Sequence, residues 1–223
     1  LPMNQPSRLA MAMLLMALTF LIGPFLVVFA AGFGTGETMK FPPEGFGLRW
    51  FWHVLQVESF QQSFMTSLGV GLGSTTLALL LGVPVAYALS RHRSPGLEWM
   101  RTALTLPLIV PGIIVGLALM NVLVLVYQLP VVSSLMVGHT ALLLPYAVRI
   151  VSSSLANLRV DIDDAAMTLG ATRLQAFFKV VLPNIRAGVA AAFILAFITS
   201  FNQVPVSLFL TGPGISTLPI EMM

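Results

Sequence analysis

Long runs of sequence without a charged residue constrain this chain more than any other feature. Such runs cover residues 9–31, 64–90, 102–148 and 187–217. A helix that crosses the hydrocarbon core of a bilayer needs about 20 apolar residues, and the third run is roughly twice that length. It contains Leu129 and Pro130, and we divide it there. The sequence therefore predicts an all-α integral membrane protein, a polytopic helical bundle with five visible spans.

The five predicted spans and the segments between them belong to one transmembrane domain, residues 1–223. The spans are residues 9–31, 64–90, 102–128, 133–156 and 187–210; residues 32–63 form an external segment, and residues 157–186 form the longest cytoplasmic gap. The aromatic residues 50–52 predict a short interfacial helix before the second span. Because Leu210 would lie outside and the chain stops at Met223 without a polar tail, we expect a trimmed sequence with a sixth span beyond its end.

The composition agrees with a bilayer environment. Only 9% of the residues are charged and 57% are hydrophobic, whereas a soluble domain carries roughly 25% charged residues. The absence of cysteine excludes disulfides and thiolate metal sites. The eleven Lys and Arg residues are scattered through short gaps, so they form no face for nucleic acid. Lipid is the expected surrounding and nucleic acid is not an expected partner.

The placement of the cations predicts the orientation. With the N-terminus inside, the outer segments hold only Lys40 and Arg49. The inner segments hold Arg8, Arg91, Arg93, Arg101, Arg159, Arg173, Lys179 and Arg186. Positive loops are retained in the cytoplasm, so we expect the N-terminus inside.

The most informative segment is residues 161–183, within the longest inner gap. Asp161 is a good N-cap with Asp164 at the third helical position, and an apolar face follows. Gly170 is expected to end this helix.

A second short helix is predicted directly afterwards. Thr172 and Gln175 have the spacing of a capping box, and Pro183 ends the pattern. Its apolar stripe consists of Leu174, Phe177, Phe178, Val181 and Leu182. Such a pair either docks against a partner protein or lies on the bilayer surface. Three aspartates at 161, 163 and 164 favour docking, because an anionic membrane surface disfavours them.

These residues resemble a known family motif. Asp164-Ala165-Ala166, Gly170 and residues 180–183 look like the EAA loop of the permeases of binding-protein-dependent ABC importers, with Asp in place of Glu at 164 and Val in place of Ile at 180. The similarity extends more loosely over residues 64–223. The stretch 211–214 before 217–219 resembles the spermidine/putrescine branch.

The resemblance implies a type I importer fold with a six-helix core in a bacterial inner membrane. It implies that a coupling helix seats in a groove of an ATP-binding subunit, through Asp164, Ala165, Ala166, Gly170, Ala171, Leu182 and Pro183. It further implies two permease subunits, two ATPase subunits and an external solute-binding protein. ATP and Mg would be bound by the ATPases, and this chain would bind no cofactor and carry no catalytic residue.

Polar residues within the spans are the candidates for a solute path: Asn121, Asn202, Gln203 and Ser207. They could equally form hydrogen bonds between helices. Polyamine permeases tend to place acidic groups near the positions of Gly112 and Asn202, and no carboxylate stands at either. A polyamine-like, an amino-acid-like or another small polar solute therefore all stay open. Arg149 either reaches the cytoplasmic surface or lines the cavity.

The rival interpretation is an ion-gradient-driven secondary transporter or channel. Such carriers keep carboxylates or histidines within their spans. Here all eight acidic residues lie in the gaps, and His139 alone lies in a span. A purely structural membrane subunit is a further alternative. Gly69 with Gly73, and Gly112 with Gly116, are spaced for close helix packing instead of nucleotide binding.

Overall fold

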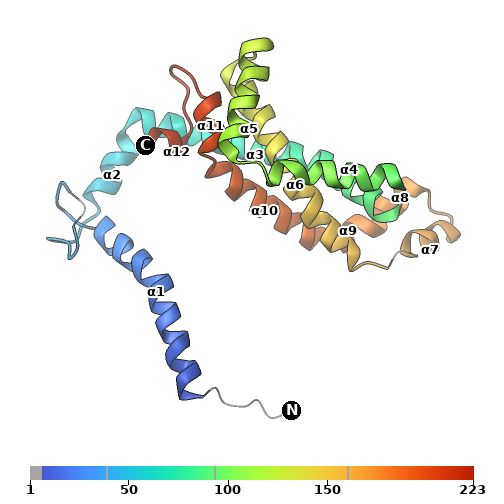
Figure 1. The fold of residues 1–223 in the computed structure, drawn as a ribbon, viewed down its shortest axis with the longest axis horizontal. Helices are drawn as coiled ribbons and strands as arrows, with labels where there is room; N and C mark the ends of the chain where they lie inside the picture. Colours follow the sequence, from blue (N-terminus) through green and yellow to red (C-terminus); the bar gives the residue numbers. More distant parts are fainter. Residues whose placement is uncertain (1–6, 39, 93, 160) are drawn as a thin grey trace. The chain divides into compact units, whose positions relative to one another are not determined.

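The protein is described by a computed structural model over residues 7–38, 40–92, 94–159 and 161–223. Arg93, counted above among the inner cations, lies outside these ranges. Within them the regular elements are helices, accompanied by two isolated bridges, Gly34 with Phe46 and Gly212 with Ile215 (Figure 1). The predicted all-α fold is confirmed.

The chain divides into two units, residues 1–58 and residues 59–223. In the first, α1 (Arg8–Gly32) begins at Ser7, whose Oγ accepts a hydrogen bond from the amide of Ala10. A loop leads to α2 (Arg49–Gln56), at the position of the predicted interfacial helix. The loop is held by a hydrogen bond of 3.0 Å from Trp50 Nε1 to the carbonyl of Gly36.

The second unit is built on the long helix α3 (Glu58–Arg91), which has 34 residues, all but Glu58 within this unit. It packs against α6 (Val131–Ala156) and α10 (Arg186–Phe201) through small side chains. A Cβ at Gly82 would lie 2.9 Å from that of Ala147, and one at Gly71 would lie 3.0 Å from the Phe197 ring. The core between these three helices includes Ala78, Ala86, Leu143, Ala147, Val151, Ala192 and Ala196.

The stretch expected as a single span over residues 102–128 is bent. α4 (Pro95–Thr105) and the short 3₁₀ turn η1 (Leu106–Leu108) meet α5 (Gly112–Leu119) and the π-helical η2 (Met120–Val126) at 100°. Pro111 explains the break, because its backbone is extended and it has no amide proton to continue a helix. Pro84 and Pro145, in contrast, lie inside continuous helices.

Close packing at a glycine pair joins α5 to α11 (Pro205–Leu210). A Cβ at Gly116 would lie 2.7 Å from the carbonyl oxygen of Pro205, and one at Gly112 would lie 3.1 Å from the Pro205 ring. The predicted packing role of this pair is therefore confirmed. Gly69 differs, because a Cβ there would meet nothing within 4 Å.

The predicted fifth span is also interrupted. α10 ends at Phe201, the chain turns at residues 202–204, and α11 follows. Beyond α11, a turn leads to α12 (Leu218–Glu221), whose first amide donates a 2.7 Å hydrogen bond to the Oγ of Ser67 on α3.

Three described helices, α1, α3 and α6, are long and apolar enough to cross a membrane. Two bent pairs, Pro95–Leu108 with Gly112–Val126 and Arg173–Asn184 with Arg186–Phe201, raise the number to five if each pair is one span. This upper count within the described residues agrees with the five spans expected from the charge-free runs.

Candidate functional site

The helix α7 (Ile162–Thr168) occupies the first half of the predicted coupling segment. Asp161 precedes it as expected, but its carboxylate does not cap the helix. It instead accepts hydrogen bonds of 3.1 and 2.6 Å from the guanidinium of Arg159. These hydrogen bonds hold the pKa of Asp161 below its ordinary value and raise that of Arg159. The predicted side-chain cap is thus wrong, because a neighbouring cation outcompetes the backbone amides.

Gly170 ends α7 in the manner its sequence position predicts. Its φ is +89°, a left-handed conformation that favours glycine. The Gly170 amide donates to the carbonyl of Met167 at 2.9 Å, and the Ala171 amide donates to that of Ala166 at 3.1 Å. These two bonds form a Schellman motif, which fixes the direction in which the chain leaves α7.

The second half of the segment is a nearly continuous helix of three pieces, α8 (Arg173–Ala176), the π-helical η3 (Phe177–Val181) and α9 (Leu182–Asn184). Both bonds of the predicted capping box between Thr172 and Gln175 are present. The predicted apolar stripe divides: Val181 is buried, Phe177 and Leu182 pack partly against the core, and Leu174 and Phe178 are exposed.

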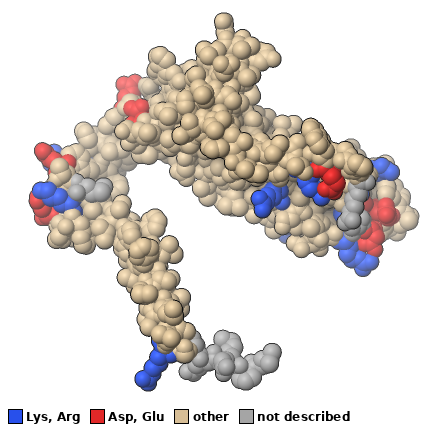
Figure 2. Space-filling model, in the orientation of Figure 1, with Lys and Arg blue, Asp and Glu red and all other residues tan. Residues whose placement is uncertain are grey.

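Among the exposed residues of this segment, we call Asp164, Ala165, Leu169, Gly170 and Leu174 the coupling surface. All five residues are exposed, with Leu169 at 89%. Among the other predicted coupling residues, Ala166, Ala171 and Leu182 are half-buried and Pro183 is exposed. Charged side chains are concentrated toward the α7 and α8 end of the second unit (Figure 2). An apolar side chain, that of Leu169, is therefore left exposed at an end of the unit that is rich in charged side chains.

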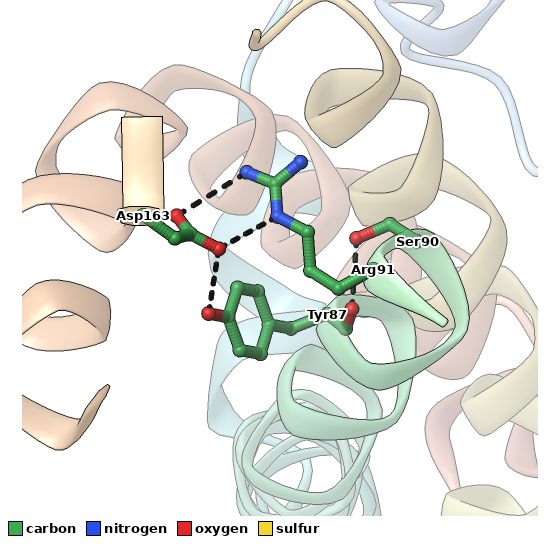
Figure 3. A network of polar contacts seen from close by, with 4 residues as sticks. All are labelled: Tyr87, Ser90, Arg91 and Asp163. Carbon is green, nitrogen blue, oxygen red and sulfur yellow. Dashed lines mark hydrogen bonds and ion pairs between the residues drawn. The ribbon is translucent and has the colours of Figure 1, made fainter. Parts of the chain in front are cut away.

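Asp163 is the neighbour of Asp164 on α7, yet it is buried whereas Asp164 is exposed. Its carboxylate accepts hydrogen bonds of 2.8 Å from the Nε of Arg91 and of 2.8 Å from the hydroxyl of Tyr87, both on α3 (Figure 3). The Arg91 and Asp163 side chains are only 7% and 11% exposed. The Tyr87 ring also contacts that of Phe177 in η3, with centroids 4.9 Å apart.

Sequence reasoning missed this group. It grouped the three aspartates 161, 163 and 164 together and counted Arg91 only as an inner cation. The one available signal is that Tyr87 and Arg91 are four residues apart and so share a face of α3. Nothing in the sequence pairs that face with a carboxylate 72 positions away.

A pocket of about 220 Å³ lies beside this group. Its lining combines acidic, basic and apolar side chains, namely Tyr87, Arg91, His92, Asp163, Asp164, Met167, Arg173 and Ala176. The pocket joins the buried ion pair to the edge of the coupling surface at Asp164.

The candidate path residues lie on different elements and differ in burial. Asn121 is exposed on η2, and Asn202 is exposed where α10 ends, with Gln203 half-buried beside it. Ser207 is fully buried and lies 3.1 Å from the Nε2 of His139. Ser207 thus has the interhelical contact that was the alternative to a path role.

Comparisons with known proteins find transport permeases among the relatives of this chain. Residues 74–222 match the family described as binding-protein-dependent transport system inner membrane component. The putrescine transport system permease protein PotI of Escherichia coli K12 is 30% identical over 93% of this chain and 76% of its own length. The spermidine/putrescine transport system permease protein PotC of the same strain is 31% identical over 80% of this chain and 68% of its own length.

Relatives with other solutes match as well. The sulfoquinovosyl glycerol transport system permease protein SmoH of Agrobacterium fabrum is 33% identical over 78% of this chain and 64% of its own length. A solved bacterial ABC transporter involved in the import of the acidic polysaccharide alginate has a TM-score of 0.70, with 99% of this chain and 81% of that chain covered. At 19% identity, the latter similarity establishes the fold alone.

Proposed function

Because the chain belongs to the family of binding-protein-dependent transport system inner membrane components, we propose that it couples solute movement to ATP hydrolysis through the coupling surface. As a permease of an ABC importer, it is a multi-pass membrane subunit. The observation that carries the proposal is the exposure of Ala165 on the short helix α7 and of Leu169 and Gly170 in the turn that ends it. A small and apolar surface of this kind favours close approach by a protein groove.

The chemistry of the surface supports a protein partner in preference to lipid. Asp164 is exposed on α7, and the exposed ion pair of Asp161 with Arg159 stands at the start of the same helix. An anionic headgroup layer would repel Asp164, because Asp161 and Asp163 already form ion pairs with arginines. Lys or Arg side chains of a partner groove would instead complement Asp164, while Leu169 and Leu174 lose their exposed apolar area.

The proposed partners are two ATP-binding-cassette ATPases, a second permease subunit and an external solute-binding protein. ATP and Mg are bound on the ATPases, where the ATP is hydrolysed, and this chain contributes neither a catalytic residue nor a cofactor site. We place the N-terminus in the cytoplasm, because this puts α7, α8 and most of the cations on the same side as the ATPases.

We propose that the solute path passes Asn121 on η2, and Asn202 and Gln203 at the break between α10 and α11. Exposed amides of this kind offer both donors and acceptors to a small polar solute. The solute is polyamine-like, amino-acid-like or another small polar compound. The names of the relatives specify putrescine, spermidine and a sulfoquinovosyl glycerol, so they favour no single solute.

The test is capture of the native assembly through an affinity tag on this chain. The expected result is recovery of a P-loop ATPase from membranes carrying the unchanged chain. Ala165→Trp should abolish that recovery, because a bulky side chain prevents close approach at the coupling surface. Recovery of the ATPase in normal amount with Ala165→Trp would overturn the assignment of this surface.

The matched control is Ala191→Trp, the same change at an exposed alanine of α10 outside the coupling segment. It should leave ATPase recovery unchanged. Capture of the unchanged chain without any nucleotide-hydrolysing protein would contradict the coupling function itself.

A further inference from the structure

We propose that Asp163, Arg91 and Tyr87 form a joint through which movement of the coupling segment drives α3, and that α3 carries this movement to the outer turn. The three are positioning residues for transport: they act on the solute path through α3. This inference rests on the proposed function, because it needs an ATPase to move α7.

The inner end of the joint is doubly attached. Asp163 on α7 is bonded to both Arg91 and Tyr87, and the Arg91 guanidinium also lies 5.7 Å from the centroid of the Tyr87 ring. The same Tyr87 ring contacts Phe177 in η3. Both helical parts of the coupling segment therefore contact the Arg91 end of α3. A shift of α7 strains the buried, charge-assisted hydrogen bond of Asp163, and a shift of η3 disturbs the ring contact of Phe177 with Tyr87.

The helix α3 is built to carry such a shift. It is a single helix from Glu58 to Arg91, and Ser67 is separated from Arg91 by about 36 Å of helix at roughly 1.5 Å per residue. Small residues lie on its buried face, among them Ala78, Gly82 and Ala86. Packed helices with small side chains at their contact can shear by small displacements.

The outer end of α3 is attached to the segment that follows α11. Ser67 Oγ accepts the 2.7 Å hydrogen bond from the amide of Leu218, and that bond is buried. Residues of the same turns of α3, including Ser63 and Thr66, line a polar pocket of about 230 Å³ together with Gly212 and Ser216. One helix thus contacts both the coupling segment and the outer turn.

The experiment measures movement of the outer turn in response to nucleotide. The chain contains no cysteine, so Pro213→Cys places one thiol on the exposed turn between α11 and α12. Maleimide labelling of the 24.0 kDa chain is followed in the captured assembly, with and without ATP, Mg and orthovanadate. The trapped nucleotide shifts the conformational equilibrium because it binds the two conformations with different affinities. We expect the labelling rate to change about threefold or more.

Asp163→Asn should abolish this nucleotide-dependent change, while the ATPase is still recovered and still hydrolyses ATP. Exchanging the charges with Arg91→Asp and Asp163→Arg should restore much of it, which a purely structural role of Asp163 does not predict. If Asp163→Asn fails to assemble, the nucleotide-dependent labelling of the variant with exchanged charges still decides the test.

Two outcomes overturn the joint. One is an unchanged response in the Asp163→Asn assembly, and the other is a thiol at position 213 that fails to respond to nucleotide in the assembly with the native joint. Failure of the proposed function looks different, because no ATPase would then be recovered with the unchanged chain. Asp161→Asn, which removes an exposed carboxylate from the start of α7, is the matched control and should respond normally.

Discussion

His139 on α6 lies 3.1 Å from Ser207 on α11, measured from the imidazole Nε2 to the serine Oγ. Its Nδ1 lies 2.8 Å from the Oγ of Ser200 on α10. One buried ring therefore spans the break between α10 and α11 and holds both helices to α6.

The first prediction concerns this contact. His139→Leu should lower the free energy of unfolding by about 1–3 kcal/mol, because two buried hydroxyls lose their partner. Thermal unfolding of the purified chain in detergent measures the loss. Adding Ser200→Ala and Ser207→Ala to His139→Leu should recover part of it, since no polar group is then left unpaired. A triple variant less stable than His139→Leu alone would contradict the pairing.

The second prediction concerns the contact between α5 and α11. Gly116→Val should destabilise the chain by about 1–3 kcal/mol through overpacking, because the added Cβ meets the backbone of Pro205 and Val206. The measurement is again thermal unfolding in detergent. Gly69→Val is the control, since a Cβ there meets nothing within 4 Å. Equal losses at the two glycines would show that helix propensity, and not packing, decides the effect.

The third prediction tests whether substitutions of Gly170, in the coupling surface, destabilise the chain through the backbone conformation and not through the size of the new side chain. Gly170→Val places a β-branched residue at φ +89° and should cost about 1–2 kcal/mol in the isolated chain. Gly170→Asn should cost less, because asparagine tolerates this conformation better. There is room for either Cβ, since nothing lies within 4 Å of it. Urea titration of the chain in mixed micelles gives both values, and Gly96→Val, another glycine with open space, is the control.

The fourth prediction concerns acid titration of the coupling segment. Hydrogen bonding from Arg159 lowers the pKa of Asp161 from its ordinary value of 3.8. The pair therefore contributes its stabilisation above that ordinary value, and the contribution disappears as the pH falls through the lower folded-state pKa. Arg159→Gln should return the pKa of Asp161 toward 3.8, as measured by carboxyl NMR of labelled protein. Since the pair is exposed, added salt should screen it and should also move the pKa of Asp161 toward 3.8.

Much of the local structure followed from the sequence. Three features each depend only on residues within one or two turns: the capping box at Thr172, the end of α7 at Gly170, and the short helix α2. The side chain of Asp161 was predicted wrongly because two local partners compete for it, the backbone amides of α7 and the guanidinium of Arg159. The sequence shows that both partners are near Asp161, but it does not show which of them binds its carboxylate.

The sequence by itself determined a helical membrane protein, its apolar runs and the motif around Gly170, because hydrophobic length, turn chemistry and capping are properties of consecutive residues. Only the tertiary structure decided that Asp163 faces α3 whereas Asp164 faces outward. It also decided that His139 joins α10 and α11 to α6. The physical reason is that a buried polar group must find its partner wherever packing brings one within hydrogen-bond distance, and these partners lie more than sixty positions away along the chain.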